Sequence, residues 1–182
     1  FNKKIKDYKN QTLYNNCVSL LPQDVQTVFM KNTVKEELAE VIKSNIELPF
    51  SLEHLYDKHP YDISGGEQQL VAFAKVLATK PRLLLMDEPT KGLDSQYKRL
   101  IIGILNKLKE GGTTILIVTH DVEFAAKCAD RCDLFYLGNI VSINRPNLFF
   151  SSNNFYTTSS VKMTKGFYDN AVTVEQVAKL CK

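Results

Sequence analysis

The stretch "RLLLMDEPTKGLD", residues 82–94, places two adjacent acids directly after a short apolar run. Three leucines and a methionine in succession predict a buried strand, so Asp87 and Glu88 would stand at its carboxyl end. Acids in this position suggest a metal ion or a phosphate as their partner. A helix cap or an ion pair is the alternative that these residues leave open.

Two further apolar runs, "CVSLL" (17–21) and "TTILIVT" (113–119), lack the alternation of a half-buried strand. This pattern is typical of strands that are covered on both faces in a parallel sheet. The carboxyl ends of parallel strands share one edge, where α/β folds bind their ligands. Because Gln23, the acid pair and His120 each follow one of the three runs, we predict that they converge at that edge.

Helical patterns lie between the predicted strands. In "SGGEQQLVAFAKVLAT", Ser64 and Glu67 have the spacing of a capping box, and apolar residues follow at helical period. In "DSQYKRLIIGILNKLKEGG", Asp94 is the expected N-cap and Gly111 the terminator. The segment "TVKEELAEVIKS" predicts another helix, opened by Thr33, and "SLEHLYDK" a short one.

These patterns predict an α/β fold with a mostly parallel sheet over residues 1–182. A mainly helical subdomain, at about 25–80, is inserted between the first two strands. Residues 133–143 are expected to form a hairpin that turns at Gly138-Asn139. The tail, at about 145–182, is polar and loop-rich and closes with a helix opened by Thr173 and Gln176.

Composition excludes several function classes. The chain is 44% hydrophobic and 24% charged, which is ordinary for a globular protein, and its net charge of +3 is too small to indicate nucleic acid as a partner. The longest apolar runs are too short to span a bilayer. Cys128 and Cys132, expected at i and i+4 of one helix, are read with Cys17 and Cys181 as small core residues rather than metal ligands.

The motifs together resemble the ATPase domains of ABC (ATP-binding cassette) proteins. "ISGGEQQ" resembles the signature motif of that family, and "RLLLMDEPTKGLD" its Walker B strand and D-loop. "VTHD" resembles the switch-histidine segment and "LLPQD" the Q-loop. The resemblance implies a P-loop-type ATPase fold with an inserted helical subdomain, and ATP and Mg²⁺ as ligands.

The resemblance also implies a role for each polar residue at the predicted edge. Asp87 would hold Mg²⁺ through its water shell, because this cation prefers oxygen ligands. Glu88 would act as general base on the water that attacks the γ-phosphate. His120 would hydrogen-bond that phosphate and help to orient the water. Gln23 would offer its amide oxygen to Mg²⁺ or water and link the nucleotide to the transport partner.

Ser64, Gly65, Gly66 and Glu67 begin a helix, where free N–H groups and the helix dipole favour an anion. On these residues alone, a capping box is the better interpretation. With the acid pair downstream, the resemblance implies that they contact ATP bound to the opposite subunit of a dimer. Asp94 would both cap its own helix and touch the facing subunit.

The P-loop of such ATPases is missing. It requires G-x-x-x-x-G-K-[ST], and none of the eight glycines is followed by lysine. In the family this loop precedes the Q-loop, so we expect an N-terminally truncated cassette that begins downstream of Walker A. A regulatory cassette without activity of its own, in which the loss is real, is the alternative.

Two segments resemble a narrower group. "LLPQDVQTVFMKNTVKEEL" and "FYTTSSVKMTKGFYDNAVTVEQVAKLC" are similar to ATP-binding subunits of energy-coupling-factor importers of vitamins and metal ions, especially the second cassette of a duplicated protein. This implies a peripheral location on the cytoplasmic face of the membrane and a transmembrane partner. It also implies a head-to-tail dimer with a second cassette, on the same polypeptide in the duplicated form. A non-transport ABC ATPase remains the runner-up, although we see no long coiled coil or basic arm.

We expect the 182-residue chain to show no ATPase activity by itself, because it lacks the amides and the lysine that hold the β- and γ-phosphates. The measurement is phosphate release from Mg-ATP, with a longer protein that carries both this sequence and a P-loop as positive control. Release by the chain that disappears in its Glu88→Gln variant would contradict this expectation.

Overall fold

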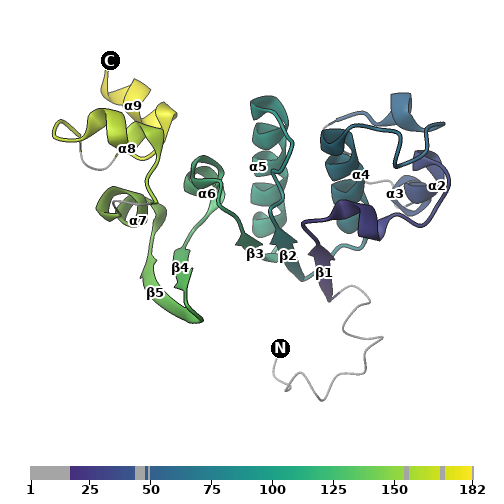
Figure 1. Ribbon diagram of the computed structural model, residues 1–182, viewed down its shortest axis with the longest axis horizontal. Coiled ribbons are helices and arrows are strands. Elements are labelled where there is room, and N and C mark those ends of the chain that lie inside the picture. The colour runs from purple at the N-terminus through teal and green to yellow at the C-terminus, as the bar shows by residue number, and fades with distance from the viewer. Residues whose placement is uncertain (1–16, 44–47, 49, 154–155, 169–170, 182) are drawn as a thin grey trace. The chain divides into compact units, whose positions relative to one another are not determined.

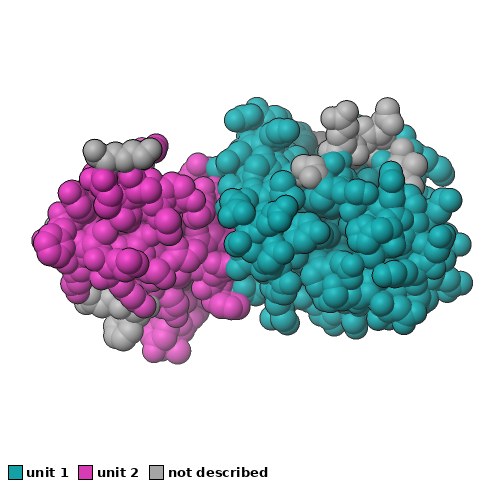
Figure 2. Space-filling view, turned by 90° about the horizontal axis from the view of Figure 1, so that it is seen from above, with its two compact units in different colours: residues 1–118 teal, residues 119–182 magenta. Residues whose placement is uncertain are grey.

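The computed structural model places most of the chain. The residues it describes are 17–43, 48, 50–153, 156–168 and 171–181. The chain divides into two compact units, residues 1–118 and residues 119–182, and each is described by itself (Figure 2). Within the described part of the chain, no helix is both long enough and apolar enough to cross a membrane.

The first unit contains a parallel sheet with the strand order β1–β2–β3 (Figure 1). The strands, each within one residue of its predicted run, are β1 (Val18–Leu21), β2 (Leu83–Asp87) and β3 (Thr114–Val118). The central strand β2 pairs on both sides, so that Leu85 lies opposite both Leu20 and Leu116. Because all three strands run in the same direction, their carboxyl ends meet at one edge.

Helices cover one face of this sheet. The predicted long helices are confirmed as α4 (Gly65–Ala78), which packs against β1, and α5 (Ser95–Glu110), which packs against β3. At the end of α4, the hydroxyl groups of Ser19 and Thr79 form a hydrogen bond of 2.6 Å. The strand side chains buried on the covered face are Leu21, Leu84 and Met86.

The opposite face of the sheet is open. Leu20, Leu116 and Val118 are 55%, 58% and 60% exposed. The prediction that the strands are covered on both faces is therefore wrong for the described residues. The sequence pattern shows which side chains are apolar, but it does not show whether another element covers them. Helices α4 and α5 cover only one face and leave the second face exposed to solvent.

The insert between β1 and α4 is less helical than predicted. The helical segments described there are η2 (Val25–Val28), α2 (Val34–Glu37), α3 (Ala39–Lys43) and η3 (Glu53–Leu55). Thr33 caps α2 as expected, since its hydroxyl accepts from the N–H of Glu36 at 3.2 Å. The predicted continuous helix nevertheless breaks at Leu38, whose backbone turns out of helical geometry.

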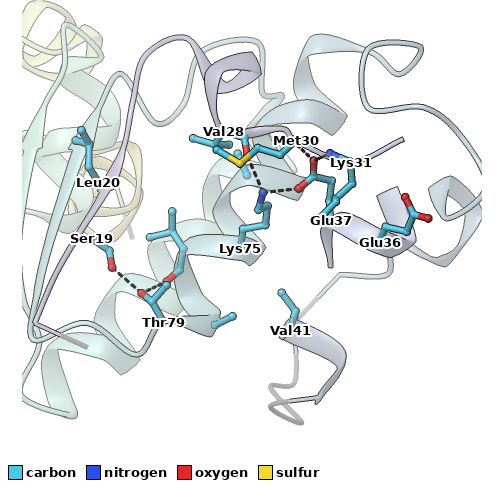
Figure 3. A pocket seen from close by; sticks show the side chains of 13 residues that line it. Ser19, Leu20, Val28, Met30, Lys31, Glu36, Glu37, Val41, Lys75 and Thr79 are labelled. Atoms are coloured by element: carbon cyan, nitrogen blue, oxygen red, sulfur yellow. Dashed lines mark hydrogen bonds and ion pairs between the residues drawn. The ribbon is translucent and has the colours of Figure 1, made fainter. Parts of the chain in front are cut away.

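A buried ion pair joins the insert to α4 (Figure 3). The Glu37 side chain is 2% exposed, and its carboxylate accepts from the Lys75 ammonium group and from the backbone N–H groups of Met30 and Lys31. Lys75 also donates to the carbonyl oxygen of Val28 over 2.6 Å. The pair lines a pocket of about 390 Å³ and fixes the segment after η2 to the side of α4.

The second unit contains a hairpin and short helices. Its elements are α6 (Val122–Cys128), β4 (Cys132–Tyr136), β5 (Asn139–Asn144), α7 (Pro146–Ser152), α8 (Ser159–Thr164) and α9 (Val174–Leu180). The predicted hairpin is confirmed, but it turns at Leu137 and Gly138, which both have positive φ, one residue earlier than expected. Its core is built around Phe149, Phe150 and Val172.

Two predictions for this unit need correction. The tail is not mainly loop, because α7 and α8 precede the closing helix α9, which does begin with the expected capping box of Thr173 and Gln176. Cys128 and Cys132 do not share a helix either, since Cys128 ends α6 and Cys132 begins β4. All four cysteines are free, and no cluster of metal-ligating side chains occurs among the residues described.

We predict that Glu37→Ala lowers the free energy of unfolding by about 3 kcal/mol. This is the lower end of the range for breaking a buried ion pair, because the Lys75 side chain is 25% exposed and regains some hydration. Chemical denaturation followed by circular dichroism measures the loss. Glu36→Ala, an exposed acid on the same short helix, is the control and should change stability by less than about 0.5 kcal/mol. Equal effects of the two substitutions would contradict the anchoring role.

Candidate functional site

Three of the predicted site residues stand at the carboxyl edge of the parallel sheet. Asp87 ends β2 opposite Val118, Glu88 follows it, and Gln23 comes two residues after β1. Asp87 and Glu88 are half-buried, whereas Gln23 is exposed. The structure therefore places the acid pair and this amide at one edge of a single sheet.

The backbone of Glu88 adopts an uncommon conformation. Its φ of 47° lies in the left-handed region, which non-glycine residues enter at a cost of about 1–3 kcal/mol. Its N–H donates to the carbonyl oxygen of Val118 at 2.8 Å, and its own carbonyl accepts from the N–H of Lys91 at 3.2 Å. Strained residues that their surroundings hold in place occur preferentially at functional sites.

The start of α4 is the predicted capping box. The Ser64 hydroxyl accepts from the Glu67 N–H at 3.3 Å, and the Glu67 carboxylate accepts from the Ser64 N–H at 2.8 Å and from its hydroxyl at 2.7 Å. These bonds lower the pKa of the Glu67 carboxyl from 4.5, and the electrostatic effects of Lys58 and His54 act in the same direction against the effect of burial. Gly65 is exposed, with open space around it.

The first turns of α4 lie against the loop that follows the acid pair. A Cβ added at Gly66 would stand 2.9 Å from the carbonyl oxygen of Gly92, which itself has a φ of 75°. One turn further along α4, the buried amide of Gln69 donates to the carbonyl oxygen of Pro89 over 3.1 Å. The capping box and the acid pair are thus parts of one packed assembly.

Sequence reasoning missed Gln69 and the buried pair of Glu37 and Lys75. The available signal was a polar residue within a stretch that is otherwise apolar. Residues 68–74 of α4 are all buried, so a glutamine among them needs a hydrogen-bond partner.

Asp94 and His120 are the two remaining site residues predicted from the sequence. Asp94 caps α5, as predicted, since its carboxylate accepts from the N–H groups of Gln96 and Tyr97 at 2.8 and 2.9 Å. It is exposed and so remains open to a partner. His120 follows β3 by two residues but belongs to the second unit, and its expected role beside Glu88 stays a prediction.

The oxygen-bearing side chains at the sheet edge fit a hard divalent cation. Asp87 and Gln23 offer carboxylate and amide oxygens, which are the ligands that Mg²⁺ accepts alongside water and phosphate. Glu88, next to Asp87 and held rigidly by β3, can accept a proton from a water molecule at the same edge. Taken together, these groups are suited to phosphate chemistry that is assisted by a metal ion.

The chain matches a family model described as "ABC transporter" over residues 1–91, which is half of its 182 residues. It is 46% identical over 133 residues to a Bacillus anthracis protein named as an ABC transporter ATP-binding protein, covering 73% of this chain and 24% of that protein. It is 36% identical over 135 residues to the glutamate transport ATP-binding protein GluA of Corynebacterium glutamicum, and this match covers 74% of this chain and 53% of GluA. The chain thus spans about a quarter of the length of the Bacillus relatives.

Solved structures of ATP-binding cassettes share the fold. The dimeric cassette MJ0796 bound to ADP and Pi has a TM-score of 0.64 and 25% identity, covering 80% of this chain and 71% of that one. The cbiO1 protein of Clostridium perfringens, described as part of the transporter complex cbiONQ, also has a TM-score of 0.64, with 27% identity. That match covers 83% of this chain and 66% of cbiO1.

We predict that Glu67→Gln makes the stability of the folded protein less sensitive to a fall in pH. Because the folded pKa of Glu67 is lowered, its charged form stabilises the protein above a pH of about 4.5, and this contribution is lost as the pH falls through the folded pKa. A glutamine oxygen still accepts the capping bonds but does not titrate. Thermal unfolding at about pH 6 and about pH 3 should therefore show a smaller drop in Tm for the variant. The exposed-acid variant Glu110→Gln is the control, and an unchanged drop in Glu67→Gln would refute the assignment.

Proposed function

The chain belongs to the ABC transporter family, and we propose that it forms part of an ATP-hydrolysing subunit that powers transport of a small molecule. The observation that carries the proposal is the acid pair at the end of β2, at one sheet edge with Gln23. In this proposal residues 1–182 are part of one cassette, with a helical subdomain at about 25–80 and a tail at about 145–182. The similarity to MJ0796 and cbiO1 supports it.

Asp87 and Gln23 would hold Mg²⁺, which supplies positive charge against the phosphate oxygens when it is bound. Glu88 holds a water molecule in line with the γ-phosphorus and accepts its proton as the water attacks. The new bond joins the water oxygen to phosphorus, and the bond to the β–γ bridging oxygen breaks, so that ADP leaves with the electron pair. His120 would donate a hydrogen bond to the γ-phosphate.

A second cassette would complete the site. Ser64, Gly65, Gly66 and Glu67 would present the N-terminus of α4 to the triphosphate bound by the partner, where the helix dipole favours an anion. The exposed carboxylate of Asp94 would face the same partner. The dimeric form of MJ0796, with ADP and Pi, supports this arrangement. The partner cassette would stand head to tail with this one, on the same polypeptide or on another.

Among transporter branches, we favour an energy-coupling-factor importer of a vitamin, a vitamin precursor or a metal ion. The similarity to cbiO1, which belongs to a transporter complex, supports this choice. The chain would then act at the cytoplasmic face of the membrane beside a transmembrane partner, without nucleic acid. The similarity to GluA, a glutamate transport protein, favours an amino-acid importer as the second candidate.

We predict that Glu88→Gln, in a protein that carries both this chain and a P-loop, lowers kcat for ATP by about 10²–10⁴-fold, because an amide keeps the shape of the base but cannot accept the proton. Binding of a fluorescent ATP analogue should stay within about threefold of the parent value. Steady-state phosphate release and fluorescence titration measure the two quantities. Glu110→Gln, at the exposed end of α5, is the control for charge loss. Near-normal turnover by Glu88→Gln would rule out its role as the base.

A further inference from the structure

Gln69 is a buried amide that joins α4 to the loop carrying Glu88. The residue is 2% exposed, and its Nε2 donates to the carbonyl oxygen of Pro89 over 3.1 Å. A carbonyl oxygen only accepts hydrogen bonds, so the amide atom that faces it is the nitrogen. Removing this donor would leave the Pro89 carbonyl in a buried site without that bond.

The bonded carbonyl belongs to the residue directly after Glu88. Glu88 has a left-handed backbone, with a φ of 47°, which persists only where neighbouring groups hold it. On one side, its N–H is bonded to the Val118 carbonyl in β3. On the other side, the carbonyl of the next residue, Pro89, is bonded to Gln69. The direction in which the Glu88 carboxylate leaves the backbone is therefore set by contacts on both sides.

A second contact from α4 fixes the same loop. Gly66 precedes Gln69 by three residues on α4, and Gly92 follows Pro89 by three residues in the loop. A Cβ at Gly66 would approach the Gly92 carbonyl oxygen to 2.9 Å, so the two backbones are in close contact. Because residues three apart lie on the same side of a helix, these two contacts set both the distance and the orientation of the loop against α4.

We propose that Gln69 is a positioning residue for Glu88, holding the carbonyl of the next residue, Pro89, so that the Glu88 carboxylate meets the attacking water at the required distance. The inference rests on the proposed function, because it requires Glu88 to be the general base. A displacement of about 1 Å in a catalytic group can cost about 10²-fold in rate. Loss of the Gln69 amide is therefore expected to lower turnover more than nucleotide binding.

The neighbouring residue, Gln68, provides a matched control. It is also buried, at 6% exposed, and its Nε2 also donates to a proline carbonyl, that of Pro60, over 3.0 Å. Pro60 lies in a turn before α4 rather than in the loop after β2. Gln68→Met and Gln69→Met each remove a buried amide bond to a proline carbonyl from the same helix, and Gln68→Met also removes the bond that the Gln68 side-chain oxygen accepts from the Gln26 amide over 3.3 Å. Only the bond of Gln69 adjoins Glu88.

The experiment compares these variants in a protein that carries both this chain and a P-loop. Gln69→Met should lower kcat about 10- to 100-fold and change KM for ATP by less than about threefold. Gln68→Met should lower Tm at least as much as Gln69→Met, because it removes two side-chain bonds, but it should keep kcat within about threefold. Unchanged kcat in Gln69→Met, or equal loss of kcat in the two variants, would overturn the positioning role.

A second measurement uses the Glu88→Gln background. If Gln69 acts through Glu88, adding Gln69→Met should change the residual rate of Glu88→Gln by less than about twofold. If Gln69→Met lowered the rate in this background by as large a factor as in the parent protein, Gln69 would act independently of the base, and the inference would be overturned. Full activity of Glu88→Gln by itself would instead overturn the role of Glu88 as the base, and absence of ATP hydrolysis in the parent protein would overturn the proposed function. An inactive Glu88→Gln with a fully active Gln69→Met would overturn the positioning role alone.

Discussion

The parallel pairing of β2 between β1 and β3 is the constraint on which the candidate site depends. Once Leu85 stands opposite Leu20 and Leu116, the strands end together, and whatever follows each strand is delivered to the same edge. The hydrogen bond from Glu88 to Val118 extends this pairing by one residue and carries the acid past the end of the strand. A shift of the register by one residue would turn Asp87 to the other face of the sheet.

Helix α4 connects this edge to the rest of the first unit. Its first turn carries the capping box, its second turn bonds the loop after Glu88, and its last turns carry Lys75, which is paired with Glu37. A helix with continuous internal hydrogen bonds behaves as a stiff rod over this length. The loop after Glu88 and the segment after η2 are therefore both anchored to the same rigid helix, although they lie far apart in the sequence.

The elements predicted correctly are those that are specified by residues close together in the sequence. The strands were found by their apolar runs, and α4, α5 and α9 by caps whose bonds are made within four residues. The sequence also placed the acid pair at a strand end, because strand length and burial are visible in "RLLLM". The break at Leu38 and the helices of the tail depend on tertiary packing, which overrides helical periodicity in short segments.

The polar contacts of the core were not predictable in the same way. Glu37 occupies a position of the apolar stripe formed by Val34, Leu38 and Val41, which marks it as unusual but does not name its partner. Lys75 follows Glu37 by 38 residues, and the two meet only because α2 and α4 pack together. Gln69 likewise bonds a carbonyl 20 residues away, in a loop whose course depends on the completed sheet.

The close approach of Gly66 to Gly92 changes how mutagenesis of the α4 N-terminus has to be interpreted. Even one methyl group at position 66 would clash with the carbonyl oxygen of Gly92 and displace the loop that follows Glu88. An inactive alanine variant would thus be accounted for without any contact between this glycine and a ligand. Gly65, where a methyl group meets nothing within 4 Å, is the neighbouring position at which the same substitution leaves that loop undisturbed.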